Sequence, residues 1–218
     1  MTQTAATRTP ASTAATKTAA AAATESRPRG RPPSGARERI LEAALEVIKA
    51  EGYAGTSLDK VAARAGESKG LVAYHYGSKQ GLVAEVARAV AETITSVVLE
   101  RLDRVDDVEG IIGATADGVD RVLDDDVRLA RVYFDLAAVS VVDPEIRSAI
   151  AEINEGWRAV LVERLTGAGL AAARSRVLTV MVIAGIQGLA LERIERGKTA
   201  ELRQARDLFV RGAVAAAS

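Results

Sequence analysis

The sequence contains no cysteine, one histidine and few aromatic residues. Without cysteine the chain can form neither disulfide bonds nor thiolate metal sites, and it needs no oxidising compartment. Aromatic residues make up 3% of its 218 residues, whereas alanine, leucine, valine, arginine and glutamate dominate. Because this bias favours helices over the strands of a sandwich or barrel, the composition predicts an all-α protein.

The chain also lacks a long uninterrupted apolar run. Its most apolar stretch, Val177 to Leu191, is short for a membrane-spanning helix, and Gln187 and two glycines interrupt it. The N-terminus is rich in alanine and threonine and has no continuous apolar segment like that of a signal peptide. We therefore expect a cytoplasmic protein with no membrane partner.

Neither sign of charge is in excess, because 29 basic residues balance 29 acidic ones. The signs are unevenly distributed, however. Up to Lys79 there are twelve Lys and Arg residues against seven Asp and Glu, so this part carries +5 and the remainder −5. A basic front and an acidic back indicate that the N-terminal part faces nucleic acid.

Residues 1–34 form a low-complexity tail with almost nothing large and apolar to bury, so we predict a disordered basic arm. Its end, Arg27-Pro28-Arg29-Gly30-Arg31-Pro32-Pro33, resembles the core of an AT-hook. In such a segment arginines beside a glycine enter a narrow minor groove. Arg27, Arg29 and Arg31 are therefore candidate DNA contacts, and a solvated basic linker is the alternative interpretation.

Helical periodicity begins at Arg37, and Gly52 stands where a helix C-cap is expected. A second helix is predicted from Thr56, which forms a capping-box pattern with Asp59. Further helices are predicted over residues 68–76, from 79 past 99, and over 107–123, 127–142, 144–165, 172–195 and 200–216.

The second and third of these helices are short and are joined by a tight turn at Gly66. This pattern is typical of a helix-turn-helix, whose second helix enters the DNA major groove. Lys69 can reach a base edge or a phosphate, and Gly70 lets the backbone approach closely. Tyr74 and His75 can donate hydrogen bonds to phosphate oxygens. Packing at the end of its helix is the alternative for His75, and no second His or Cys exists to make it a metal ligand.

The stretch Thr56-Ser57-Leu58, Val61-Ala62, Ala65-Gly66, Ser68-Lys69-Gly70, Tyr74-His75-Tyr76, Ser78-Lys79 and Leu82 resembles the N-terminal signature of the TetR family of transcriptional regulators. The resemblance covers roughly residues 36–85. It implies an N-terminal three-helix DNA-binding domain with a helix-turn-helix, followed by a larger helical domain for ligand binding and dimerisation. The expected divisions are the arm over 1–34, the DNA-binding domain over 35–82, and the effector-binding and dimerisation domain over 83–218.

The resemblance also implies roles for individual positions. Thr56 is expected to contact a phosphate from the start of the second helix. The residues expected to face the major groove are Ser68, Lys69, Gly70, Leu71 and Ala73, and those expected to hold the DNA backbone are Tyr74, His75 and Lys79. The sequence departs from the family at Ala73, where tyrosine is frequent, and at Tyr76, where phenylalanine is usual.

The aromatic residues of the C-terminal part cluster in its middle helices. In regulators of this family a pocket among these helices binds a small, often apolar effector, and large apolar side chains with a few polar groups suit that purpose. The candidate ligand-binding residues are Tyr133, Phe134, Asn154, Trp157 and Leu161. Ordinary core packing of the aromatic side chains is the alternative.

The last two predicted helices each present an apolar face, and Gly185 and Gly188 permit close helix approach. The candidate dimer residues are Leu178, Val182, Gly185, Ile186, Leu189, Leu202, Ala205 and Phe209. A symmetric four-helix contact would place two DNA-binding domains on one palindrome. The alternative is that these faces form a purely intramolecular core.

These observations predict a homodimeric repressor that a small-molecule effector releases from a palindromic DNA operator. The alternative is an effector-independent or architectural DNA-binding protein that uses the arm and the helix-turn-helix together. An enzyme is not expected, because the sequence has no Gly-rich phosphate loop, metal-ligand spacing or nucleophile–base pair. No cofactor is expected, and the Asp124-Asp125-Asp126 run is interpreted as a polar loop.

Overall fold

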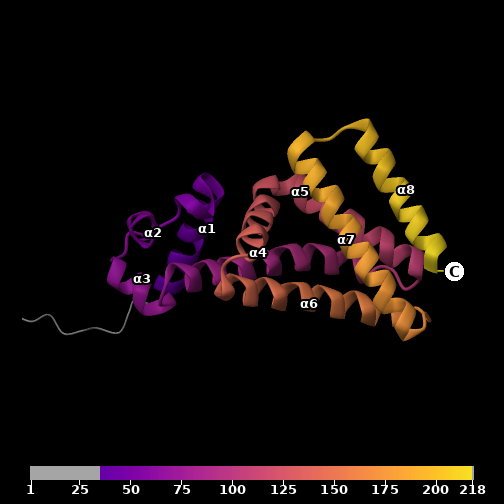
Figure 1. The fold of residues 1–218 in the computed structure, drawn as a ribbon, viewed down its shortest axis with the longest axis horizontal. Helices are drawn as coiled ribbons and strands as arrows, with labels where there is room; N and C mark the ends of the chain where they lie inside the picture. The colour runs from indigo at the N-terminus through magenta and orange to yellow at the C-terminus, as the bar shows by residue number, and fades with distance from the viewer. Residues whose placement is uncertain (1–34, 218) are drawn as a thin grey trace, which may run out of the picture. The chain divides into compact units, whose positions relative to one another are not determined.

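The computed structural model describes residues 35–217, which form eight α-helices and no strand (Figure 1). The helices are α1 (Ala36–Gly55), α2 (Leu58–Ala65), α3 (Lys69–Tyr76), α4 (Lys79–Leu102), α5 (Val108–Val139), α6 (Pro144–Gly167), α7 (Ala172–Arg196) and α8 (Ala200–Ala217). The predicted all-α class is confirmed. The arm over residues 1–34, with its candidate DNA contacts Arg27, Arg29 and Arg31, lies outside the described residues.

Serine side chains cap the helices of the N-terminal part. Ser68 accepts a hydrogen bond from the Leu71 N–H at 3.1 Å, and Ser78 accepts one from the Gly81 N–H at 2.8 Å. Such a cap stabilises a helix by about 1 kcal/mol. The cap of α2 is Ser57 and not Thr56 as predicted, because the Ser57 side chain accepts from the backbone N–H of the third residue of the helix.

Helix α5 is divided by a break, so the two helices expected over residues 107–123 and 127–142 are both present within it. It bends at Asp126, whose φ of −154° and ψ of 91° are not helical. The Asp126 carboxylate accepts a 3.0 Å hydrogen bond from the Arg128 N–H and so caps the following turn at once. The acidic run therefore separates two helical segments as predicted, although the break is a kink at one residue and not a polar loop.

The eight helices share two main apolar cores. The first joins α1, α2 and α3 to the start of α4, the second half of α5 and the start of α6. The second joins the end of α4, the first half of α5 and the end of α6 to α7 and α8. Figure 1 shows α4 and α6 running alongside each other, and they are in contact. Because α4 passes through both cores, the domain border predicted at residue 82 falls inside a continuous helix.

Helix α7 is long and apolar enough, by length and composition alone, to cross a membrane, and it is the only such helix in residues 35–217. One of its faces, with Leu178 and Val182, is buried in the second core. The opposite face, with Val177 and Val180, is exposed. The apolar character of α7 thus serves the core on one side and is left uncovered by the described residues on the other.

Candidate functional site

Helix α3 is anchored by one face and exposed by the other. Val72 and Tyr76, one turn apart, are buried, and the Tyr76 hydroxyl donates a 2.7 Å hydrogen bond to the Arg37 carbonyl. The turn before α3 uses Gly66, whose φ of +67° is a left-handed conformation that glycine adopts without strain. As a result the N-terminal end and outer face of α3 are open, which is the arrangement a helix needs to enter a DNA groove.

The exposed residues of α3 and its cap include several of the predicted DNA contacts: Ser68, Lys69, Gly70 and Tyr74. The Tyr74 side chain is 74% exposed. The Lys69 ammonium lies 2.8 Å from the Asp59 carboxylate, and both side chains are largely exposed. Because such exposed pairs contribute little, a phosphate can replace Asp59 as the partner of Lys69. Leu71 and Ala73 are half-buried at the edge of this face.

Three residues predicted to contact the DNA backbone have polar groups that are buried or hydrogen-bonded inside the N-terminal part instead. Thr56 is buried, and its hydroxyl donates a 2.8 Å hydrogen bond to the Gly52 carbonyl, so the predicted phosphate contact is wrong. The Lys79 ammonium donates to the Tyr53 carbonyl at 2.7 Å, and burial lowers its pKa. The Nε2 atom of His75 is buried without a hydrogen-bond partner among the described residues, so this nitrogen does not point at a phosphate.

A cavity of about 110 Å³ lies among helices α4, α5, α6 and α7. Four of the five predicted ligand-binding residues line it, namely Tyr133, Phe134, Trp157 and Leu161. The rest of its wall is mostly aliphatic: Ile94, Val98, Leu99, Leu102, Val119, Val122, Leu123, Ala130, Val160, Ile183, Ile186 and Ala190. The cavity is therefore an apolar site of the kind that holds small molecules.

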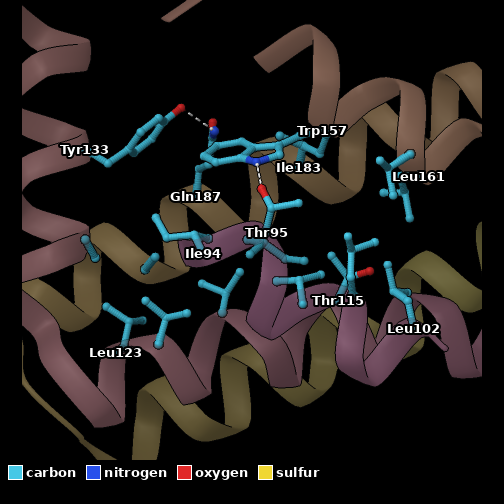
Figure 2. A pocket seen from close by; sticks show the side chains of 18 of the residues that line it. Ile94, Thr95, Leu102, Thr115, Leu123, Tyr133, Trp157, Leu161, Ile183 and Gln187 are labelled. Carbon is cyan, nitrogen blue, oxygen red and sulfur yellow. Dashed lines mark hydrogen bonds between the residues drawn. The ribbon is translucent and has the colours of Figure 1, made fainter. Parts of the chain in front are cut away.

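Polar groups gather at one part of this cavity (Figure 2). The Tyr133 hydroxyl donates a hydrogen bond to the side-chain oxygen of Asn154 at 2.8 Å and accepts one from the side-chain amide of Gln187 at 3.0 Å. Asn154 therefore does not line the cavity but holds Tyr133, which does. The Trp157 indole N–H donates to the Thr95 hydroxyl at 2.8 Å. Sequence reasoning missed Thr95 and Gln187 as site residues, although the interruption of an apolar run by Gln187 was a usable signal.

Tyr133 remains a neutral phenol in this setting. Burial raises its pKa above the ordinary value of 10.0, and this outweighs the opposing hydrogen bonds with Asn154 and Gln187 and the positive charge of Arg158. Its ring also lies 5.0 Å from the Trp157 ring and 5.3 Å from the Phe134 ring, centroid to centroid. The aromatic cluster thus forms one wall of the cavity.

The second half of α5 contacts both this cavity and the end of α1. Ala130 and Phe134 line the cavity. On the same stretch, the Asp135 carboxylate accepts a 2.7 Å hydrogen bond from the Tyr53 N–H, and Asp126 accepts a 2.9 Å bond from Lys49. A displacement of this half of α5 would therefore move α1, which contacts α2 and α3.

The face of α7 on which we predicted the dimer contact is turned inward. Leu178, Val182 and Ile186 are buried within the chain, and Ile186 lines the cavity, so the prediction is wrong for these three residues. Gly185 and Phe209 contact each other within the chain, because the Phe209 ring occupies the space where a Cβ at position 185 would lie. Their contact is the close approach of α8 to α7, as the intramolecular alternative supposed.

The remaining predicted dimer residues are divided. Leu189 and Leu202 are half-buried beside a charged groove, whereas Ala205 is exposed. Exposed apolar or small residues instead lie along the opposite face of α7 and along α8, and we call the two sets together the outer stripe. This outer stripe comprises Val177, Val180, Met181, Ala184, Gly188 and Leu191 of α7 and Ala205, Leu208, Gly212 and Ala215 of α8.

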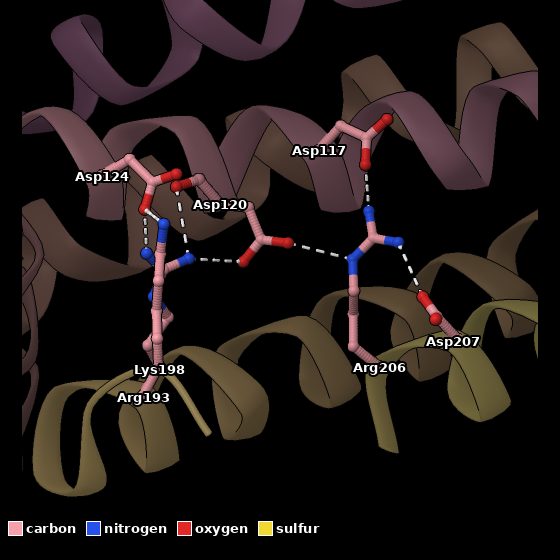
Figure 3. Close-up of polar contacts among 7 residues, drawn as sticks. All are labelled: Asp117, Asp120, Asp124, Arg193, Lys198, Arg206 and Asp207. Carbon is pink, nitrogen blue, oxygen red and sulfur yellow. Dashed lines mark hydrogen bonds and ion pairs between the residues drawn. The ribbon is translucent and has the colours of Figure 1, made fainter. Parts of the chain in front are cut away.

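Ion pairs fasten α7 and α8 to the first half of α5 (Figure 3). Arg193 pairs with Asp120 at 3.0 Å and also with Asp124, while Arg206 pairs with Asp120 at 2.9 Å and also with Asp117. Asp124 and Asp126 of the acidic run are thus bound to basic side chains. Within residues 35–217, no group of three or more His, Asp or Glu side chains is placed to hold a metal ion.

Comparison with known proteins agrees with this arrangement. Residues 40–86 match the family model of bacterial regulatory proteins of the tetR family. Residues 110–208 match the model of the C-terminal domain of LmrA/YxaF-like transcriptional regulators. No curated protein matches the sequence.

Solved structures share the fold. A transcriptional regulator from Pseudomonas aeruginosa is 24% identical with a TM-score of 0.71, over 82% of this chain and 88% of that one. A transcriptional regulator from Streptomyces coelicolor A3(2) is 26% identical with a TM-score of 0.69, over 84% and 99%. The multidrug binding protein EbrR in complex with imidazole is 25% identical with a TM-score of 0.66, over 80% and 93%.

The two family models follow each other along the chain and together cover the helix-turn-helix and most of the helical part that encloses the cavity. Their order is the one that the motif around α3 implied. The exposed face of α3 supplies the DNA-binding element, and the helices behind it supply the cavity. The chain therefore belongs to the TetR family of DNA-binding transcriptional regulators.

Proposed function

We propose that the protein is a repressor, not an enzyme, that binds a palindromic operator as a homodimer in the cytoplasm and releases it when a small apolar molecule fills the cavity. The proposed base and groove contacts are Ser68, Lys69, Gly70, Leu71 and Ala73, with Tyr74 on the DNA backbone. The single observation that carries the proposal is the double contact of α5, which touches both the cavity and α1.

The size of the cavity supports a mechanical response to a ligand. An engineered apolar cavity of about 150 Å³ holds one benzene molecule, and the cavity here measures about 110 Å³. An effector larger than one ring that lies wholly inside the cavity displaces its wall. Ala130, Tyr133 and Phe134 belong to the part of that wall formed by α5. Moving them shifts Asp126 and Asp135, which hold Lys49 and Tyr53 of α1, and so reorients α3 relative to DNA.

The outer stripe supports the homodimer. Val177 and Val180 are 72% and 59% exposed, and Leu208 on α8 is 62% exposed. Exposed apolar residues on two helices that contact each other indicate an interaction surface, and two copies of a helix pair can bury each other in a symmetric four-helix contact. Such symmetry places two copies of α3 on the two halves of a palindrome. The ion pairs of Arg193 and Arg206 hold α7 and α8 in place for this contact.

The test begins with footprinting of the purified protein on genomic DNA to locate the operator. Neutral aromatic compounds are then screened for release of the labelled operator and for a change in the fluorescence of Trp157, the only tryptophan. The variant Ala190→Leu adds side-chain volume that the empty cavity can take up without displacing α5, so it should bind the operator with wild-type affinity. Because the space for the effector is then occupied, it should fail to release the operator. Release that persists in this variant would place the effector elsewhere. Operator binding that no compound affects would favour an effector-independent DNA-binding protein.

A further inference from the structure

We infer that the cavity selects neutral ligands and rejects cations of the same shape. This inference rests on the proposed function, because it names the chemical class of molecule that the same cavity accepts. It concerns the charge of the ligand and not the release of DNA, so the two can be tested apart.

The wall of the cavity carries no charge to receive a cation. Among the described residues that line it, the polar ones are Thr95, Thr115, Tyr133, Trp157 and Gln187, and none of them is a carboxylate or a base. A cation that enters such a site gives up its hydration and gains no counter-charge. A neutral ring of equal size gives up little and gains the apolar contact.

Tyr133 cannot supply the missing negative charge. Its hydroxyl group is buried, which favours the neutral phenol over the phenolate. The ionised side chain that acts on this hydroxyl is Arg158, and its charge is positive. Both effects disfavour a cation at the polar part of the cavity.

The same polar part has one unused acceptor. The Thr95 hydroxyl donates to the Ala91 carbonyl at 2.6 Å and accepts from Trp157, and the Tyr133 hydroxyl is occupied on both sides. The side-chain oxygen of Gln187 makes no hydrogen bond within residues 35–217, whereas its side-chain nitrogen donates to Tyr133. A neutral ligand with an apolar ring and one O–H or N–H group thus matches both the wall and this oxygen.

The likeness to EbrR does not decide the charge of the ligand. EbrR structures hold proflavin or ethidium, and ethidium is a permanent cation. They share 26% of their residues with this chain, so the fold can be kept while the lining differs. The lining of this cavity decides in favour of neutral molecules.

The test uses toluene and N-methylpyridinium, which have the same shape and heavy-atom count and differ in charge. Binding to the full-length protein without DNA is measured by titration calorimetry and by the shift in melting temperature. Toluene should bind saturably, and N-methylpyridinium should bind at least about a hundredfold more weakly, because the aromatic faces of Tyr133, Phe134 and Trp157 offset only part of its lost hydration.

The variant Gln187→Glu places one carboxylate at the polar part of the cavity with almost no change in shape. Above neutral pH it should strengthen N-methylpyridinium binding by about tenfold or more and weaken toluene binding. Gln80→Glu is the matched control, because Gln80 lies in the first turn of α4 and does not line the cavity. It should leave both affinities unchanged.

The outcomes separate the inference from the proposed function. If N-methylpyridinium competes with toluene at similar affinity in the wild-type protein, the inference is overturned and the cavity remains a ligand site. The inference is also overturned if Gln187→Glu and Gln80→Glu behave alike. If toluene gives neither binding heat nor a shift in melting temperature, in the wild-type protein as in Ala190→Leu, the cavity is not a ligand site. The proposed function then fails together with the inference.

Discussion

Lys49 of α1 donates a 2.9 Å hydrogen bond to Asp126, the residue at which α5 departs from helical geometry. The Lys49 side chain is only 9% exposed, and it pairs with Asp126 and with Glu46, the latter at 3.4 Å. The pair joins α1, the first helix of the DNA-binding part, to the kinked helix that lines the cavity. Its energy and its part in effector response are both measurable.

The pair should stabilise the fold in a pH-dependent way. Although burial acts to raise the pKa of Asp126, hydrogen bonds from Lys49 and Arg128 hold it below its ordinary value. A carboxylate with a lowered folded-state pKa stabilises the protein above about pH 4, the value of the unfolded chain, and this contribution is lost as pH falls through the folded-state pKa. Asp126→Asn should therefore lower the free energy of unfolding by about 1–2 kcal/mol at neutral pH, because it leaves Lys49 poorly paired.

Urea unfolding of both proteins, from neutral pH down to about pH 3, measures this difference, which should shrink at the acidic end. Asp125→Asn is the matched control, because Asp125 is the neighbouring residue and makes an exposed pair with Arg121 at 2.8 Å. A difference that stays the same at every pH would show that the ionised form of Asp126 is not the stabilising one.

Asp126→Asn should also weaken the transmission from cavity to DNA. Effector binding, followed by Trp157 fluorescence, should be nearly unchanged because Asp126 does not line the cavity. The reduction in operator affinity caused by the effector should fall by about 1 kcal/mol, roughly fivefold. Fluorescence anisotropy of the labelled operator with and without effector measures it. Equal coupling in the wild-type protein, Asp126→Asn and Asp125→Asn would remove this pair from the pathway.

The exposed face of α3 should carry the specific DNA affinity. Lys69→Ala should weaken operator binding by about 1–3 kcal/mol where a base contact is lost, and Tyr74→Ala should weaken it by the loss of a contact to the DNA backbone. Both variants should keep the wild-type melting temperature because the side chains are exposed. Thr56→Val should behave oppositely. Its buried hydroxyl bonds to Gly52, so the loss should appear in stability by about 1 kcal/mol before it appears in affinity. Unchanged operator affinity in both α3 variants would refute the assignment of this face.

The outer stripe should control assembly. Val177→Asp places a charge in the proposed seam and should give monomers in analytical ultracentrifugation. Val141→Asp is the matched control, because Val141 and Val177 are both 72% exposed and only Val177 lies on the stripe. Ile186→Asp should instead disrupt folding, because Ile186 is buried beside the cavity. A dimer that survives Val177→Asp, or one that Val141→Asp dissociates, would place the interface elsewhere.

The N-terminal arm should add affinity on operators flanked by A·T-rich sequence. The Arg-Gly-Arg-Pro run around Gly30 precedes α1 by only a few residues, so it can reach the minor groove next to the site of α3. Its contribution should fade as salt rises, because it is mostly electrostatic. Deletion of residues 2–33 is compared on two operators that differ only in their flanks. An equal loss on both would make the arm a nonspecific basic linker.

The sequence alone determined the features that depend on neighbours a few residues away. Helical periodicity, the serine caps at Ser68 and Ser78 and the turn at Gly66 arise from local hydrogen bonding and backbone geometry, so the helix-turn-helix could be predicted from them. The aromatic cluster of Tyr133 and Trp157 could also be assigned to a pocket, since few other large side chains compete for that role.

Only the tertiary structure decided which groups are already engaged and which face is free. Nothing local distinguishes Lys79 as a phosphate ligand from Lys79 bonded to the Tyr53 carbonyl, because Tyr53 lies 26 residues away at the end of α1. The same holds for α7, which is apolar on two faces, so its periodicity fits either a core at Val182 or a surface at Val177. Burial is a property of the elements that pack against a helix, and for α7 these are α5, α6 and α8, whose placement the sequence of α7 does not contain.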